Sequence, residues 1–134
     1  ANKIFRMIHL WYTTPMAIDP TPFKKKLLAE KDALESELAT VARKNPANPK
    51  DWEPVPDARE DIPASRDDIA DKIESFEENV AITRQLEARL AEVRDALERI
   101  ENGSFGHCTV CRGAIETERL NANPAAQTCK QHLR

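Results

Sequence analysis

The chain has 134 residues, of which 32% are charged and 5% aromatic, and it contains three glycines. This composition is typical of long polar helices rather than of a thick globular core, and the length suits one domain or a small domain with an appendage. The net charge of −3 argues against a general nucleic-acid binder, which would usually be basic.

Residues 1–20 are predicted to form an N-terminal extension. The apolar run over residues 4–12 is interrupted by Arg6 and His9 and is too short to span a bilayer. We find no signal peptide and expect a cytoplasmic protein without membrane contacts. The extension is either dispensable, with Met16 as a second possible start, or it packs on the base of the molecule or on a partner.

A first helix is predicted to begin at Thr21, with Thr21 as the N-cap and Pro22 at the first helical position. It is expected to end near Lys44, before Pro46. Apolar residues recur at steps of three, four and seven, which marks one helical face. These residues are Phe23, Leu27, Leu34, Leu38 and Val41.

The next segment, residues 45–65, contains five prolines, which exclude a regular helix. It is longer than an ordinary connection between helices, so we expect a functional or mobile loop. Trp52 is expected to pack back onto the helices as a small hydrophobic clasp.

Acidic residues gather in this loop and at the start of the helix that follows it. Arg59 and Arg66 are the only basic residues among them between Asp51 and Asp71. The acidic residues are Asp51, Glu53, Asp57, Glu60, Asp61, Asp67, Asp68 and Asp71. They form either a solvated tip or a probe that enters a basic or metal-containing cavity, and such a tip would be repelled by nucleic acid.

A second helix is predicted from Ser65, its N-cap, to a C-cap at Asn102 and Gly103. Its apolar positions alternate in steps of three and four, which predicts a coiled-coil seam. The seam consists of Ile69, Ile73, Phe76, Val80, Thr83, Leu86, Leu90, Val93, Leu97 and Ile100. At 1.5 Å per residue this helix should be about 50 Å long.

Two matching seams joined by one loop predict an antiparallel helical hairpin over residues 21–102. If Lys44 lies near Arg66, then Phe23 lies near Glu87. In that arrangement the last four turns of the second helix would continue alone toward the C-terminal segment.

Residues 103–134 carry the pattern of a structural zinc site. Cys108 and Cys111 form a C-x-x-C pair, and Cys129 and His132 form a second close pair 17 residues later. Four such ligands suit tetrahedral zinc and leave no open catalytic position. The alternatives are a Cys108/Cys111 dithiol, or His107 as the fourth ligand.

Two glycines flank the first metal pair. Gly106 precedes Cys108 and Gly113 follows Arg112, and both suit turns that need positive φ. Both residues are therefore predicted to shape the first knuckle.

The C-terminal segment resembles the DksA/TraR family of zinc-finger proteins. The resemblance rests on the run A-L-E-R-I-E-N-G-S-F-G-H-C at residues 96–108, on the cysteine spacing, and on the phrase R-L-x-A-x-P-x-A that starts at Arg119. It is specific over residues 95–132, extends more loosely through the hairpin, and does not include residues 1–20.

This resemblance implies a mainly α fold, in which a C-terminal zinc finger sits at the base of an antiparallel coiled-coil hairpin. It also implies a transcription regulator that binds bacterial RNA polymerase through its secondary channel, without needing DNA contacts. The family's tip pattern D-x-x-D-x-A falls on residues 65–70, where Asp68 and Ala70 match and Ser65 replaces the first aspartate. Asp67 supplies a charge one residue away.

Two other departures from the family concern the C-terminal end. The fourth metal ligand is His132 rather than cysteine. The sequence ends two residues after it, without the helix that longer relatives use for the alarmone ppGpp, so we do not expect ppGpp binding.

Four basic residues of the finger are candidates for contact with an acidic polymerase surface, or are ordinary solvated charges. They are Arg112, Arg119, Lys130 and Arg134. The competing hypothesis is a finger that binds RNA, DNA or the ribosome, with the hairpin as a spacer or dimerisation arm. An enzyme is not expected, because no nucleophile–base pair and no open metal position is present.

Overall fold

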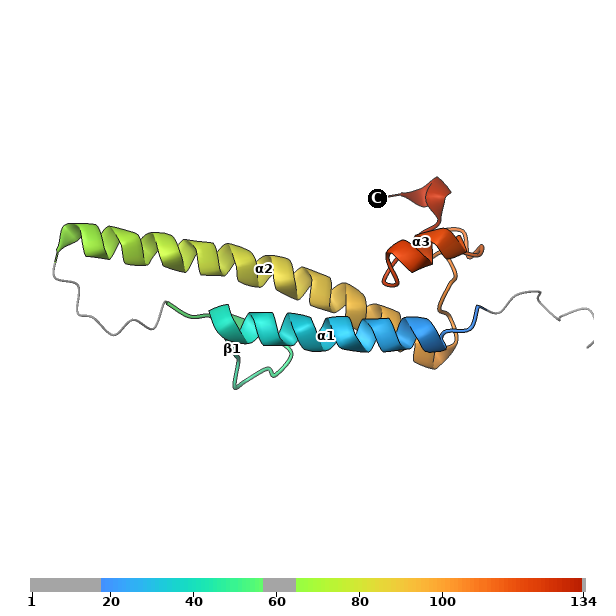
Figure 1. Ribbon diagram of the computed structural model, residues 1–134, viewed down its shortest axis with the longest axis horizontal. Coiled ribbons are helices and arrows are strands. Elements are labelled where there is room, and N and C mark those ends of the chain that lie inside the picture. The colour runs from blue at the N-terminus through green and yellow to red at the C-terminus, as the bar shows by residue number, and fades with distance from the viewer. Residues whose placement is uncertain (1–17, 57–64, 134) are drawn as a thin grey trace, which may run out of the picture.

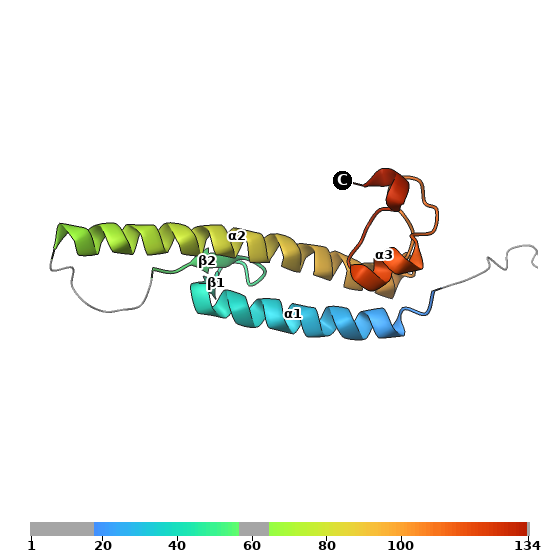
Figure 2. The same ribbon diagram turned by 45° about the horizontal axis from the view of Figure 1, so that its top comes forward.

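The computed structural model describes residues 18–56 and 65–133, and it is mainly helical (Figure 1). In chain order the elements are α1 (Thr21–Val41), β1 (Ala42–Lys44), β2 (Trp52–Pro54), α2 (Arg66–Asn102), α3 (Thr117–Ala122) and a short 3-10 helix (Lys130–His132). The helices α1 and α2 lie side by side as an antiparallel pair, and the C-terminal segment lies at one end of it (Figures 1 and 2). Within the described residues, no helix is both long and apolar enough to cross a membrane.

Helix α1 buries the face that its periodicity predicts: Phe23, Leu27, Leu34 and Leu38 are all buried. The prediction of Thr21 as the N-cap is wrong, because Thr21 is already helical and Pro20 holds the cap position. The Asp19 carboxylate accepts a hydrogen bond from the Thr21 N–H at 3.0 Å. It therefore satisfies one of the donors that a helix start leaves free.

The helix ends at Val41, three residues before the predicted end at Lys44, because residues 42–44 form strand β1. This strand pairs antiparallel with β2, with Lys44 opposite Trp52. Trp52 is buried with 6% of its surface exposed and packs in the same cluster as Leu38 and Leu90. The predicted clasp of Trp52 onto the helices is thus confirmed, although the strand pair itself was not predicted.

Helix α2 begins as the sequence predicts. The Ser65 hydroxyl accepts from the Asp68 N–H at 3.2 Å, and the Asp68 carboxylate accepts from the Ser65 N–H at 2.9 Å. This reciprocal capping box satisfies two backbone donors at the first turn. The helix ends at Gly103, whose φ of 80° is the left-handed C-cap.

The predicted alignment of the two helices is wrong. Helix α1 packs on the C-terminal half of α2, so that Phe23 stacks near Phe105 at 5.5 Å between ring centroids and Lys24 lies 3.9 Å from Glu101. The turns that extend beyond α1 are therefore the first turns of α2, and not the last ones (Figure 1).

The strand pair explains this offset. Because β1 and β2 pair with each other, the chain returns at Trp52 to the end of α1, and the Val55 carbonyl then accepts from the Asn79 side chain at 3.0 Å. The ten steps from Val55 to Ser65 can span at most about 33 Å. The 13 steps from Arg66 to Asn79 rise only about 20 Å as helix, so the connection is long enough to reach a helix start far beyond α1.

The predicted seam of α2 consequently has two different environments. Its members Thr83, Leu90 and Val93 are buried, as is Ala96, which the prediction did not include. Toward the start of the helix, Ile69, Ile73 and Phe76 are 47%, 56% and 38% exposed.

The apolar interior forms two clusters. The hairpin cluster joins α1, the strand pair and the C-terminal half of α2. The finger cluster joins Phe23 to the C-terminal segment, through Cys108, Ile115, Leu120, Ala126 and Cys129. Ile18 and Phe105 pack against the finger cluster, so the start of α1 supplies part of the base on which the finger sits.

Candidate metal centre

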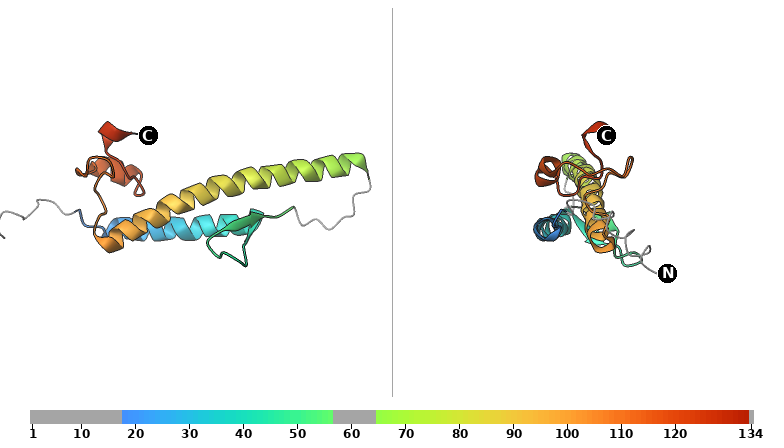
Figure 3. Two further views of the ribbon diagram at one scale, coloured as in Figure 1. Left: turned by 180° about the vertical axis from the view of Figure 1, so that it is seen from behind. Right: turned by 90° about the vertical axis from the view of Figure 1, so that its right-hand side faces the viewer.

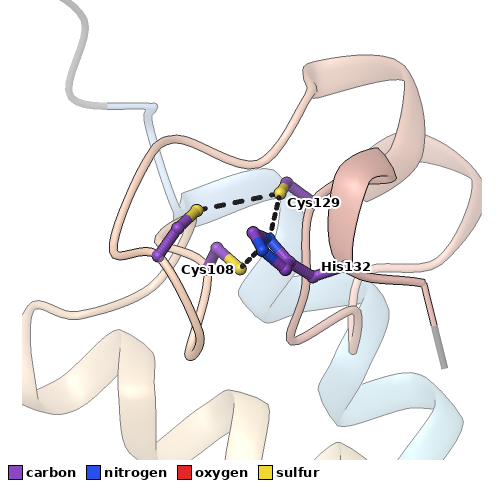
Figure 4. Close-up of side chains that lie close together, drawn as sticks. Cys108, Cys129 and His132 are labelled. Atoms are coloured by element: carbon purple, nitrogen blue, oxygen red, sulfur yellow. Dashed lines mark hydrogen bonds between the residues drawn. The ribbon is translucent and has the colours of Figure 1, made fainter.

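Four side chains converge at the C-terminal end of the molecule: those of Cys108, Cys111, Cys129 and His132. One ligand atom from each lies within 4.8 Å of all the others. Figure 4 shows Cys108, Cys129 and His132 pointing toward one another. This cluster, which has the donor set Cys3His, can bind a metal ion.

The distances fit a tetrahedral ion of the size of zinc. The Cys111 and Cys129 sulfurs are 3.8 Å apart, the Cys108 sulfur is 3.8 Å from the His132 Nδ1, and the Cys129 sulfur is 3.2 Å from it. Zn–S bonds of about 2.3 Å in a tetrahedron place two sulfurs about 3.8 Å apart. None of the three cysteines forms a disulfide.

The first knuckle is shaped by residues 106–114. Gly106 has a φ of 81°, as predicted, but Gly113 does not take a positive φ, and Arg112 does so instead at 57°. The Cys108 N–H donates to the Gly113 carbonyl at 2.8 Å, and the Arg112 N–H donates to the Cys108 carbonyl at 2.9 Å. These bonds close a tight turn that contains Cys108 and Cys111. The left-handed backbone conformation falls on Arg112, directly after Cys111.

The second pair is held by the 3-10 helix. The His132 N–H donates to the Cys129 carbonyl at 3.0 Å. The Glu116 carboxylate accepts from the Lys130 N–H at 3.1 Å, and the Arg119 guanidinium donates to the Thr128 carbonyl at 2.6 Å. Both contacts come from α3 or its N-cap, so α3 braces the loop that presents Cys129 and His132.

The electrostatics favour a thiolate at Cys108. Hydrogen bonding from the Cys111 backbone N–H is the largest effect and lowers the pKa of Cys108 to about 6, although burial opposes it. At Cys111 the Gly113 N–H acts to lower the pKa, but hydrogen bonding with Cys108, burial and the nearby Cys129 together raise it. A thiolate is the form of cysteine that binds a metal, so Cys108 is prepared to be a ligand.

The four ligands differ in exposure. Cys108 and Cys129 are buried, His132 is half-buried and Cys111 is exposed. His107 lies outside the cluster and instead pairs with Ala114 in an isolated bridge. With four protein ligands, such a centre can fix a fold but offers no vacant position for a substrate.

Comparison with known proteins identifies a similar fold. No family model matches the chain, and no curated protein matches it. Among solved structures, the chain is similar to the transcription factor DksA2 from Pseudomonas aeruginosa, with 22% sequence identity and a TM-score of 0.60 over 81% of this chain and 75% of that chain.

This chain has a DksA-like fold. The helical pair and the Cys3His cluster at its base are consistent with the DksA/TraR family. The predicted fold class is thereby confirmed.

The three residues predicted for the tip, Asp67, Asp68 and Ala70, lie in the exposed first turns of α2. The structure adds a role for Asp68 that sequence reasoning missed, because its carboxylate belongs to the capping box with Ser65. The signal was available in the sequence, since an acidic residue three positions after a serine at a helix start is the pattern of that motif.

The four basic residues predicted for surface contact separate into different environments. Arg112 is exposed next to the metal cluster. Arg119 is committed to Thr128, and Lys130 lies 3.5 Å from the Glu118 carboxylate. Arg112 and Lys130 are exposed and Arg119 is half-buried, whereas Arg134 lies outside the described residues.

Proposed function

We propose that this protein is a transcription regulator that binds bacterial RNA polymerase through its secondary channel, and that it acts in the cytoplasm without needing DNA contacts. The observation that carries the proposal is the fold, which is shared with a transcription factor of the DksA type. The fold likeness covers 81% of this chain.

The shape of α2 supports entry into a channel. Among the described residues, its first turns extend beyond α1 without a second helix beside them (Figure 1). A helix has a diameter of about 10–12 Å, whereas the adjoining part is widened by α1 and the strand pair. The narrow end is also acidic, with Asp67, Asp68, Asp71, Glu74, Glu77 and Glu78, which suits a basic or metal-containing interior and disfavours nucleic acid.

The metal centre has a structural role in this proposal. Cys108, Cys111, Cys129 and His132 would hold zinc, which would fix the finger at the base of the hairpin. Because the protein supplies all four ligands, we propose no turnover chemistry at the metal. Arg112 would face acidic polymerase surface near the channel entrance.

The first test is co-purification of the zinc-loaded protein with bacterial core RNA polymerase, in competition with a known secondary-channel factor. We expect binding that the competitor displaces. Binding that the competitor leaves unchanged, or an absence of binding, would contradict the proposal. Salt-sensitive binding to ribosomes or RNA through the finger would then support the competing hypothesis.

The second test separates the tip from the body of the protein. Asp68→Asn keeps an oxygen that can accept from the Ser65 N–H and removes the charge, and Asp67→Asn removes a neighbouring charge. We expect both variants to bind polymerase almost normally and to lose much of the effect on transcription. Glu98→Gln, an exposed carboxylate of the covered half, is the matched control. Equal effects of all three variants on transcription would remove the tip carboxylates from the mechanism.

A further inference from the structure

Arg89 of α2 lies where three parts of the molecule meet. Its Nε donates to the Glu30 carboxylate of α1 at 2.7 Å, and its Nη1 donates to Glu92 of α2 at 2.8 Å. Its Nη2 donates to the Asn123 side-chain oxygen of the finger at 3.1 Å. One planar guanidinium thus connects both helices and the finger, which a single ammonium group cannot do with the same geometry.

The finger end of this connection is itself firmly held. Asn123 is the C-cap of α3, and its N–H donates to the Arg119 carbonyl at 2.8 Å. Its side-chain oxygen also accepts from the Ala125 N–H at 3.1 Å. Ala125 belongs to the hairpin cluster and Ala126 to the finger cluster, so residues 123–126 form the joint between the two clusters.

A second arginine of α2 reaches the same joint. Arg99 donates to the Ala125 and Ala126 carbonyls, both at 3.4 Å. Burial lowers the pKa of Arg99, whereas hydrogen bonding with Glu30 raises that of Arg89. The two arginines are ten residues apart, or about 15 Å along the helix, and they converge on finger residues that are two to three positions apart. Two anchor points on α2 restrict the angle of the finger better than one would.

The angle at this joint has a large effect at the other end of α2. From Arg89 to Arg66 the helix rises about 35 Å. A tilt of about 10° at the joint would therefore move the start of the helix by about 6 Å, which is about half the diameter of a helix. Figure 3 shows how the finger stands away from the long axis of the pair, so that α2 is a lever with the finger at its base.

We propose that Arg89 is a positioning residue that, together with Asn123, fixes the angle between the finger and α2 and so aims the acidic start of that helix. The aiming role rests on the proposed function. The angle itself is a property of the free protein.

The test is the orientation of the finger relative to the hairpin, measured in the zinc-loaded full chain by NMR residual dipolar couplings. Arg89→Met and Asn123→Ala are expected to change or average the relative orientation, with zinc content and helix signal retained. Asn123→Asp keeps an acceptor for both Arg89 and the Ala125 N–H, and is expected to retain the native orientation. Glu92→Gln alters only a contact within α2 and is the control.

A structural role alone would not produce this pattern, because it would lower stability equally without changing the couplings between intact parts. Arg89→Lys should restore the orientation only partly. Native orientation in both Arg89→Met and Asn123→Ala would overturn the proposal. Should Arg89→Met not fold, Asn123→Ala decides alone, since it leaves the pair with Glu30 in place.

A transcription assay then tests the aiming role. Asn123→Ala is expected to bind polymerase within about twofold of the native protein but to lose most of its regulatory effect, and Asn123→Asp to retain it. Full regulation by Asn123→Ala would overturn the aiming role. A native protein that does not bind polymerase would contradict the proposed function, while the NMR result on the angle would stand.

Discussion

The two halves of α2 share one helix and one apolar repeat, but only one half is covered. In the C-terminal half, Leu90, Val93 and Ala96 have 1% or less of their surface exposed. In the N-terminal half, Ile73 has 56% exposed. The repeat therefore marks a face that can be buried, and the length and path of the partner decide how much of it is buried. Stability is concentrated in one half, which leaves the other available for contacts outside the molecule.

The largest expected effect is that of metal removal. It tests whether the covered half of α2 stays folded when the finger unfolds. We expect chelation to unfold the finger, because structural zinc contributes about 10–16 kcal/mol in finger peptides. Most of the helix signal should remain, since the hairpin cluster is formed chiefly by α1, the strand pair and α2. Circular dichroism would follow the helices, and NMR the finger. Complete loss of helix signal on chelation would show that the two clusters are not independent.

The next effect compares the halves directly. Leu90→Ala should lower the free energy of unfolding by about 3 kcal/mol, because it leaves a cavity in the hairpin cluster. Ile73→Ala should change it by no more than about 0.5 kcal/mol, as is usual for exposed positions. Urea unfolding of the zinc-loaded proteins, followed by circular dichroism, measures both. A large loss of unfolding free energy for Ile73→Ala would mean that the N-terminal half of α2 is covered in solution.

A smaller effect concerns the two helix starts. Ser65→Ala removes the capping box of α2 and should cost about 1 kcal/mol at the first turn, which has few buried neighbours. Asp19→Ala removes the acceptor of the Thr21 N–H at the start of α1, but that start is also held by Phe23, buried next to Phe105. Hydrogen exchange should therefore show faster exchange in the first turn of α2 for Ser65→Ala, and little change in α1 for Asp19→Ala. Equal fraying at both starts would contradict the comparison.

The smallest effect is a pH dependence at the start of α1. Hydrogen bonding from the Thr21 backbone N–H lowers the pKa of Asp19 below its ordinary value of 3.8. A lowered carboxyl pKa stabilises the folded state above the unfolded pKa, and this contribution is lost as the pH falls through the folded pKa. An NMR titration should thus place the midpoint of Asp19 below 3.8, with the Thr21 amide shifting in parallel. Asp19→Asn should abolish that shift, and a midpoint at or above 3.8 would disprove the contact.

Much of the fold was predictable, because its signals are local. The apolar period of residues 23–41, the Ser65 cap and the Gly103 C-cap each depend on a few neighbouring residues, and all are present. The spacing of the three cysteines and His132 likewise predicted the cluster that the fold brings together. Whether that cluster holds zinc, and whether Asp67, Asp68 and Ala70 contact a polymerase, remain predictions.

The alignment of the two helices was not predictable in the same way. It depends on the pairing of Ala42 with Pro54, and strands of three residues leave almost no periodic signal. A loop with five prolines was expected to be irregular throughout. It instead contributes strand β2, and the strand pair leaves the first turns of α2 uncovered by α1, whereas the last turns were predicted to be uncovered. The positive φ at Arg112 was also missed, because the positive φ of this turn was predicted at the adjacent Gly113.

The strand pair has a further consequence for any cavity that receives α2. The turn between β1 and β2 stands out from one side of the helical pair (Figure 1). Among the described residues, α2 lies beyond α1 and the strand pair from Arg66 to about Asn79, where the Val55 carbonyl is bound, a rise of about 20 Å. In a cavity that admits α2 but not this turn, the turn would limit how far the helix enters, so that lengthening or removing it would change the reach of the tip without altering a single residue of it.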